Sequence, residues 1–201
     1  PVRQEIGGHR KDVVSCEPFC LCCHACQCTA QVWFHETELC NFMIVVKLSG
    51  KALHNEQALG ALFTQLQAQG QQAIVVHGGG VEVDQILKAL DFSTTKKDGI
   101  RVSPREQMPY IAGTLAGQCN KLLQGVAVKN GLRAVGMLCT DYDLCSLKPY
   151  PQEYGQVASC VAQDGSMVEL VMQKGFTPVI CSIGLDQQGE LFNINADICS
   201  G

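Results

Sequence analysis

Three consecutive glycines that directly follow an apolar, β-branched run constrain the fold of this chain more than any other feature. Residues 73–77 read Ala-Ile-Val-Val-His, Gly78, Gly79 and Gly80 come next, and apolar residues then resume at helical spacing over 81–87. This order predicts a buried strand, a loop and the start of a helix. Because glycine has no Cβ atom, a ligand can approach the main chain, whose N–H groups attract negative charge. We therefore expect an anion-binding loop, although a tight strand-to-helix turn would give the same pattern.

A second strand and helix precede this pair. Residues 42–48 form an apolar run that includes Lys47 and is followed by the turn residues Ser49 and Gly50. Asn55 then has the character of an N-cap for a helix with one apolar face, which ends at Gly70. Strand, helix, strand and helix in this order predict a right-handed βαβ unit. The expected fold class is α/β, with a mainly parallel sheet between layers of helices.

The middle of the chain predicts a hairpin and then a long helix. Residues 92–102 contain an Asp-Gly pair between two alternating arms, which favours a tight hairpin turn. Ser103 is predicted to be the N-cap of the helix, Pro104 its first residue and Glu106 the partner that closes a capping box. Apolar residues repeat every three or four positions from there to Asn130, and Pro109 is expected to bend the helix without ending it.

The last third of the chain predicts two further buried strands, at 134–139 and 177–183, and a short helix at 167–174. Residues 146–164 have only a weak pattern. Residues 193–197, Asn-Ile-Asn-Ala-Asp, follow an alternating segment and would lie at the edge of the sheet. A sheet that has just brought such polar residues to its edge is expected to continue, so we interpret the end of the sequence as premature.

Cysteines are concentrated at the beginning of the chain. Of 13 cysteines, seven lie within residues 1–40, while the other six are spread singly. The single cysteines are interpreted as small buried hydrophobic residues of a protein in a reducing compartment. The early cluster offers possible zinc ligands, which are Cys20, Cys23, His24, Cys26 and His35. However, a structural zinc site needs two ligand pairs separated by a loop of fixed length, and the cluster lacks this arrangement. Because residues 1–40 show no helical or strand period, we expect a disordered leader outside the functional fold and no metal site.

Composition excludes two classes of partner. The formal net charge is −4 and the basic residues are scattered, so nothing suggests nucleic-acid binding. No apolar run approaches the roughly 20 residues that a membrane-spanning helix needs, and the first residues do not read as a secretory signal.

Three features are expected to meet where the parallel strands end, because ligands of α/β sheets bind at the carboxyl ends of the strands. These are Lys47 with its turn, the glycine loop at 78–80 and the polar segment 193–197. A lysine, exposed amides and a carboxylate suit phosphoryl transfer, which depends mainly on positioning and charge neutralisation. The sequence contains neither a P-loop nor the usual dinucleotide-binding glycine pattern, so the common nucleotide-binding folds are disfavoured.

Several motifs, in order, resemble the N-terminal lobe of the N-acetylglutamate kinases, which are members of the amino-acid kinase family. They cover residues 42–197, namely Val45-Val46-Lys47-Leu48-Ser49-Gly50, Val75-Val76-His77-Gly78-Gly79-Gly80, Lys97-Asp98-Gly99-Ile100-Arg101-Val102, Ala112-Gly113-Thr114-Leu115-Ala116-Gly117 with Asn120-Lys121, and Asn193-Ile194-Asn195-Ala196-Asp197. The resemblance implies a three-layer fold and transfer of the γ-phosphoryl group of MgATP to the side-chain carboxylate of N-acetyl-L-glutamate, in arginine biosynthesis. It also implies a cytoplasmic homodimer, with the helix from Pro104 as a candidate interface, and no tightly bound cofactor.

The same resemblance implies roles for individual residues. Lys47 would stabilise charge on the transferred phosphoryl group, and Asp197 would orient the catalytic lysines. Arg101 would bind the α-carboxylate of the substrate, and Asn193 would hydrogen-bond the bound amino acid. Gly79 and Gly80 would offer main-chain donors to substrate and phosphoryl oxygens, whereas Ser49, Gly50 and Gly78 would belong to phosphate-binding loops.

The chain also departs from the family pattern. The resemblance divides it into a leader (1–40), a lobe for the amino-acid substrate (41–197) and a tail (198–201), and the lobe that binds the nucleotide would be absent. Such a chain is expected to be truncated and inactive. Loop 140–144 is less rich in glycine than the family form.

Two alternative functions stay open. One is another amino-acid kinase, acting on carbamate, aspartate or glutamate; the other is a non-catalytic module that binds an amino acid and holds zinc in its leader. The sequence leaves undecided whether the chain is a natural protein or an incomplete reading frame, and whether arginine inhibits it.

Overall fold

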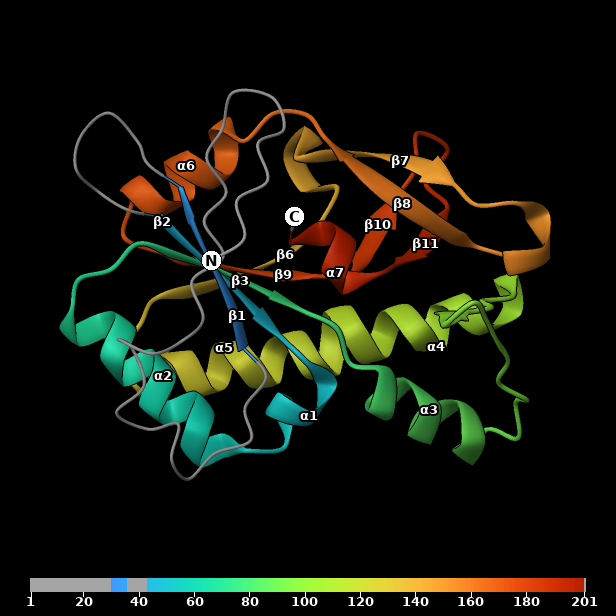
Figure 1. Cartoon of the computed structure of the whole chain (residues 1–201), viewed down its shortest axis with the longest axis horizontal. Helices are drawn as coiled ribbons and strands as arrows, with labels where there is room; N and C mark the ends of the chain where they lie inside the picture. The colour runs from blue at the N-terminus through green and yellow to red at the C-terminus, as the bar shows by residue number, and fades with distance from the viewer. Residues whose placement is uncertain (1–29, 36–42, 201) are drawn as a thin grey trace, which may run out of the picture.

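The structure is a computed structural model that describes residues 30–35, as backbone only, and residues 43–200. Its elements form three layers: a central sheet, a layer of helices on one face, and a mixed layer of one helix and a smaller sheet on the other (Figure 1). The expected α/β fold with a mainly parallel sheet is therefore confirmed.

The central sheet has the strand order β1-β2-β3-β9-β6. Its strands are β1 (Ala30–His35), β2 (Met43–Leu48), β3 (Ala73–His77), β9 (Thr177–Cys181) and β6 (Ala134–Leu138). All neighbours are parallel except β1, which pairs antiparallel with β2. The expectation that the leader holds no strand is thus wrong at residues 30–35, where hydrogen bonding to the edge of β2 compensates for the weak local pattern. The rest of the leader, with its possible zinc ligands up to Cys26, lies outside the described residues.

Side chains of the central strands alternate between two apolar cores, as the period of two in a β-strand requires. Ile44, Val46 and Leu48 of β2 pack into the core below the sheet, whereas Val45 packs into the core above it. Strands β3, β9 and β6 follow the same rule, so this part of the sheet is buried on both faces. Continuous apolar runs such as 43–46 are typical of strands in this position.

The helical face carries α1 (Gly50–Leu53), α2 (Glu56–Ala68), α3 (Gly80–Ala89) and a long helical segment that passes through η1 (Arg105–Gln107), α4 (Met108–Ala112), η2 (Gly113–Cys119) and α5 (Asn120–Lys129). Figure 1 shows these helices together below the sheet. The predicted cap of α2 is confirmed, since the Asn55 side chain accepts a hydrogen bond of 3.0 Å from the Ala58 amide.

The long helix differs from the prediction at its start and in its middle. Pro104 has an extended backbone and the Ser103 hydroxyl donates to the Arg101 carbonyl, so the predicted capping box does not form. The first turn is a 3₁₀ helix, and residues 113–119 form a π-helix. At the start of that segment, the Thr114 hydroxyl donates to the Tyr110 carbonyl at 2.8 Å and competes with the regular helical bond.

The opposite face is covered by α6 (Ser166–Gln173) and by a second sheet of order β10-β11-β8-β7. Its strands are β10 (Ile183–Leu185), β11 (Leu191–Ile194), β8 (Val157–Ala162) and β7 (Cys145–Pro149), with the short helices η3 (Asp141–Asp143), η4 (Gln152–Tyr154) and α7 (Ala196–Cys199) beside them. The weakly patterned segment 146–164 therefore forms most of a hairpin that its pattern did not predict.

The predicted strand 177–183 is in fact two strands in different sheets. The Ser182 amide donates to the His77 carbonyl of the central sheet, while its own carbonyl accepts from Ile194 of the second sheet. The chain passes from one sheet to the other at this residue. The predicted hairpin is confirmed as β4 (Lys96–Lys97) and β5 (Ile100–Arg101), because Asp98 and Gly99 both have positive φ, as a type I′ turn requires.

Within residues 30–35 and 43–200, the structure contains no helix of sufficient length and apolarity to cross a membrane.

Candidate functional site

A cavity of about 330 Å³ lies where β2, β3 and β11 end. Every residue that the sequence analysis selected lines it, and these are Lys47, Ser49, Gly50, Gly78, Gly79, Gly80, Arg101, Asn193 and Asp197. The structure thus brings together positions that are up to 150 residues apart in the chain. The reason is topological, because parallel strands deliver their carboxyl ends to one edge of the sheet.

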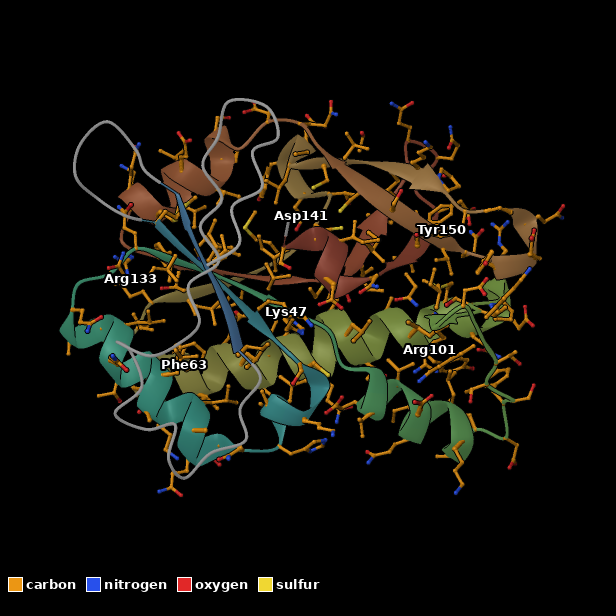
Figure 2. All side chains as sticks on the ribbon, viewed as in Figure 1. Lys47, Phe63, Arg101, Arg133, Asp141 and Tyr150 are labelled. Atoms are coloured by element: carbon orange, nitrogen blue, oxygen red, sulfur yellow. The ribbon has the colours of Figure 1, made fainter. Side chains whose placement is uncertain are left out.

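Lys47 is the cation at the centre of this edge (Figure 2). It occupies the penultimate position of β2 and is only 15% exposed, while its Nζ lies 2.5 Å from Oδ1 of Asp197 in α7. The Asp197 side chain is 60% exposed. A carboxylate on a short helix therefore holds the lysine ammonium group at the cavity wall, with its charge available to an anionic ligand.

Arg101 is the second cation and comes from strand β5 of the hairpin. Its Nη1 lies 2.5 Å from Oδ1 of Asp84 and its Nη2 donates to the Gly80 carbonyl at 3.0 Å. The hydrogen bond from Arg101 holds the pKa of Asp84 below its usual value. These contacts use two of the five N–H donors of the guanidinium group, so others remain for a ligand. The arginine thereby connects the hairpin to the first turn of α3.

The two glycine-containing turns pack against each other. A Cβ atom built on Gly50 would lie 3.5 Å from the Gly80 nitrogen. A Cβ atom on Gly79 would lie 2.8 Å from both Cys119 Sγ and Leu115 Cδ2 of the long helix. At Gly79 only a hydrogen atom fits, so this glycine allows the loop to approach the helix closely.

A buried polar network supports the glycine loop from below. His77, which is fully buried, donates from Nδ1 to the Gly78 carbonyl at 2.8 Å and accepts at Nε2 from Asn120 Nδ2 at 3.0 Å. Asn120 also donates to the Val179 carbonyl and accepts from Gln124. Only the neutral Nδ1–H form of His77 satisfies both contacts, and burial lowers its pKa.

Asn193 reaches the cavity from β11. Its Nδ2 donates to Ser103 Oγ at 3.1 Å, and the Ser103 hydroxyl donates to the Arg101 carbonyl at 3.2 Å. Ser103 is fully buried and links the two predicted substrate-binding residues. The side-chain oxygen of Asn193 remains available to a ligand.

Glu82 is a buried carboxylate behind the glycine loops. Its side chain is 8% exposed, and His54 Nε2 lies 3.0 Å from its Oε1, within the range of an ion pair when the imidazole is protonated. That contact lacks hydrogen-bond geometry, and neither oxygen accepts a hydrogen bond from the described part of the chain. Glu82 occupies the first turn of α3, where the positive end of the helix dipole offsets part of the cost of burying its charge.

Other lining residues were not assigned roles from the sequence. Lys96 of the hairpin and Ser182 also face the cavity, as does Asn195, which lies within a motif that the sequence analysis had quoted. Ser182 directly follows the end of β9, so its position after a buried strand could have indicated it. Lys96 has no such signal, because an exposed lysine in a hairpin is ordinary.

The charges around the cavity favour an anion. Lys47, Lys96 and Arg101 line it with a single carboxylate, Asp197, while Asp84 pairs with Arg101 from outside the lining. No group of three or more His, Cys, Asp or Glu residues within 43–200 is arranged to hold a metal ion. The arrangement suits a ligand with two negative charges, held by cations and main-chain amides.

Solved structures share this fold. One is smu.665 from Streptococcus mutans UA159, with a TM-score of 0.69 at 22% identity, covering 78% of this chain and 64% of that one. Another is an N-acetylglutamate synthase from Neisseria gonorrhoeae complexed with coenzyme A and N-acetyl-glutamate, with a TM-score of 0.61 at 16% identity, covering 77% of this chain and 36% of that one. At these identities the likeness concerns the fold alone.

Curated relatives are closer in sequence. The acetylglutamate kinase of Vibrio vulnificus (strain CMCP6) is 43% identical over 158 residues, which is 77% of this chain and 60% of that protein. The acetylglutamate kinase of Aeromonas salmonicida (strain A449) is 42% identical, over 77% of this chain and 61% of that protein. The chain thus spans about 60% of the length of these relatives.

The family assignment rests on most of the chain. Residues 42–201 match the amino acid kinase family, and this match covers the second sheet, every strand of the central sheet except β1, and every residue that lines the cavity. The chain therefore belongs to the amino acid kinase family.

Proposed function

We propose that residues 41–197 are the lobe of an acetylglutamate kinase that binds N-acetyl-L-glutamate. The whole protein would transfer the γ-phosphoryl group of MgATP to the side-chain carboxylate of this substrate, in arginine biosynthesis. The observation that carries the proposal is the single cavity lined by Lys47, Arg101, Asn193 and the glycine loops. N-acetylglutamate carries two carboxylates, which suit the three cations that line the cavity. The names of the relatives, at 42–43% identity, support the same substrate.

In the proposed reaction, a carboxylate oxygen of the substrate forms a bond to the γ-phosphorus, and the bond between that phosphorus and the leaving ADP oxygen breaks. Lys47 would stabilise the negative charge on the transferred group, and Asp197 would hold the lysine in place through the 2.5 Å contact. The Gly79 and Gly80 amides would donate to substrate and phosphoryl oxygens. The side chains would therefore act by positioning and charge neutralisation.

Arg101 and Asn193 would hold the amino-acid end of the substrate. The free donors of Arg101 suit the α-carboxylate, because a planar guanidinium group binds carboxylates in a defined orientation. The Ser103 bridge between the two residues would keep them at a fixed separation. Plain glutamate has a positively charged amino group where N-acetylglutamate has a neutral amide. Two cations of the cavity would repel that amino group, so plain glutamate should bind less well.

MgATP would be a co-substrate. The described residues offer no cluster of metal ligands, so magnesium would arrive on the phosphate oxygens of the nucleotide and neutralise part of their charge. Ser49, Gly50 and Gly78 line the cavity beside Lys47 and would face those phosphates. Because the chain spans about 60% of the length of its relatives, we expect it to bind the amino acid but to form acyl phosphate very slowly.

The first experiment measures binding by the 201-residue chain, using calorimetry and thermal shift with N-acetyl-L-glutamate, glutamate and aspartate. A ligand that binds only the folded state raises stability by RT ln(1 + [L]/Kd), and we expect the largest shift with N-acetylglutamate. An equal or larger shift with glutamate or aspartate would instead indicate a different amino-acid kinase.

A matched pair of variants tests the site. Arg101→Gln should weaken binding of N-acetylglutamate by about 10- to 100-fold, the usual range for a charged hydrogen bond. Arg105→Gln removes the same charge from an exposed arginine that pairs with Glu190 outside the cavity, and it should bind like the parent. Equal affinities of the two variants would contradict the assigned role of Arg101.

The proposal includes a homodimer in the cytoplasm. Tyr110, Leu122 and Val128 of the long helical segment are exposed apolar residues, which makes this segment a candidate interface. The described cysteines are free thiols, as in a reducing compartment. Sedimentation of the parent and of Leu122→Glu would test the interface, and a parent that stays monomeric at high concentration would argue against it.

A further inference from the structure

A cluster of thiols lies on the face of the central sheet that is covered by the second sheet, close to the cavity but not lining it. Cys160 of β8 and Cys199 of α7 are half-buried, and their Sγ atoms are 3.9 Å apart. Cys145 of β7 and the buried Cys139 lie nearby, since each shifts the pKa of one thiol of this pair. The proposed reaction uses none of these side chains.

The position of Cys199 connects this cluster to the cavity. Cys199 is two residues after Asp197 in α7, and Asp197 holds Lys47. The helix has only four residues, so a displacement of Cys199 must also displace Asp197. Covalent chemistry at Cys199 would therefore alter the contact between Asp197 and Lys47.

We propose that Cys160 and Cys199 form a reversible disulfide that ties α7 to β8 and shifts Asp197 relative to Lys47. The formation of this bond is independent of the proposed function, whereas its effect on ligand binding rests on that function. A disulfide bond is about 2.05 Å long, so the two sulfur atoms must approach by roughly half of their present separation, and α7 must move with them.

Geometry favours this pair over its neighbours. Cys145 lies opposite Ala162 and Cys160 lies opposite Leu147 in the antiparallel ladder, so Cys145 and Cys160 are diagonal neighbours. Diagonal residues of such a ladder are about 7–8 Å apart, beyond the usual Cα separation of a disulfide. The fully buried Cys139 donates its thiol hydrogen to the Ile183 carbonyl at 3.2 Å, which holds it away from the pair.

Cys160 is the thiol that would react first. The neighbouring thiols Cys145 and Cys199 hold the pKa of Cys160 below the ordinary value for a thiol, while their own pKa values are raised. The thiolate is the nucleophile in thiol chemistry. Half-burial leaves Cys160 within reach of a small reagent.

The oxidant would be a low-molecular-weight disulfide of the glutathione class. The Cys160 thiolate attacks one of its sulfur atoms, a mixed disulfide forms and one small thiol leaves. The Cys199 thiolate then attacks the Cys160 sulfur, the protein disulfide forms and the second small thiol leaves. In total, two protein thiols are oxidised, one small disulfide is reduced to two small thiols, and the two protons lost by the protein are taken up by the leaving thiolates.

The test treats the 201-residue chain with oxidised glutathione and maps disulfides by peptide mass spectrometry before and after reduction with a phosphine. We expect a Cys160–Cys199 crosslink that forms in the parent and in Cys145→Ser, disappears on reduction, and is absent from Cys199→Ser and Cys160→Ser. A crosslink between Cys145 and Cys160, or no crosslink within this cluster, would overturn the proposal.

Two further measurements separate the bond from its effect. Hydrogen exchange should show greater protection of residues 196–199 in the oxidised parent, and this result does not depend on any substrate. N-acetylglutamate should bind the oxidised parent about tenfold more weakly, since misplacing a group by about 1 Å in a site is costly, and oxidised Cys199→Ser should show no change. Failure of the reduced parent to bind N-acetylglutamate would count against the proposed function alone, whereas unchanged binding by the crosslinked parent would refute the coupling to Asp197.

Discussion

Tyr142 is the residue whose backbone conformation fits its side chain least well. It has a φ of 56° in the loop after β6, and its side chain is exposed. The left-handed conformation costs a residue with a Cβ atom about 1–2 kcal/mol, and glycine avoids this cost. Part of the gain is lost because glycine has more conformational freedom in the unfolded chain. Tyr142→Gly should therefore raise the free energy of unfolding by about 1 kcal/mol in urea titrations. Asp143→Gly, at a φ of 59°, should gain less because aspartate adopts this conformation more readily, and a loss of stability in Tyr142→Gly would contradict the argument.

His77 is the residue that should make stability depend on pH. Burial lowers its pKa in the folded state below the unfolded value of 6.5, so the unfolded chain binds more protons in this range. The linkage relation then requires stability to be complete above pH 6.5 and to fall as the pH drops from there toward the folded pKa. Unfolding free energies measured from pH 8 to pH 5 should show a smaller decline in His77→Gln than in the parent. Equal slopes in His77→Gln and in the parent would exclude this role for His77.

At the scale of elements, the contact of the glycine loop with the long helix predicts opposite effects for two Gly→Ala changes. At Gly79 the new Cβ atom would lie 2.8 Å from side-chain atoms of Leu115 and Cys119, so the loop must move away. Gly79→Ala should lower the free energy of unfolding by about 1–3 kcal/mol, as overpacking does, and should weaken N-acetylglutamate binding. At Gly125 in α5 no atom lies within 4 Å, so Gly125→Ala should raise the free energy of unfolding by about 0.5–1 kcal/mol through helix propensity. Urea unfolding measures both, and a stabilising Gly79→Ala would show that the loop is not packed as described.

For the whole molecule, stability depends on the apolar core between the sheet and the helical layer. Phe63 of α2 is fully buried there and lies to the left below the sheet in Figure 2. Phe63→Ala should lower the free energy of unfolding by about 3–5 kcal/mol, because it removes buried surface and leaves a cavity. Val161→Ala, at a residue of β8 that is 50% exposed, should change it by less than about 0.5 kcal/mol. If both changes lowered the free energy of unfolding by similar amounts in urea, the core between the sheet and the helical layer would not be the main source of stability.

Much of the central sheet and of the cavity could be predicted from local patterns. Strands β2 and β3, the cap of α2 and the Asp98-Gly99 turn follow from apolar runs, capping chemistry and turn preferences that a few neighbouring residues specify. The meeting of the cavity residues follows from one topological rule, since parallel strands end at the same edge. The roles assigned to these residues remain proposals.

Other features were decided by the tertiary structure, because their partners are distant in the sequence. The strand predicted at 177–183 divides at Ser182, since its amide and carbonyl bond to different sheets. The capping box fails because the Ser103 hydroxyl is occupied by Arg101 and Asn193. The hairpin of β7 and β8 and the pair of Cys160 and Cys199 likewise depend on long-range packing. By itself, the sequence therefore determined which segments form the parallel strands of the central sheet and its glycine loop. The folded chain decided which polar groups those segments meet, because a hydrogen bond between distant residues leaves no periodic pattern in either segment.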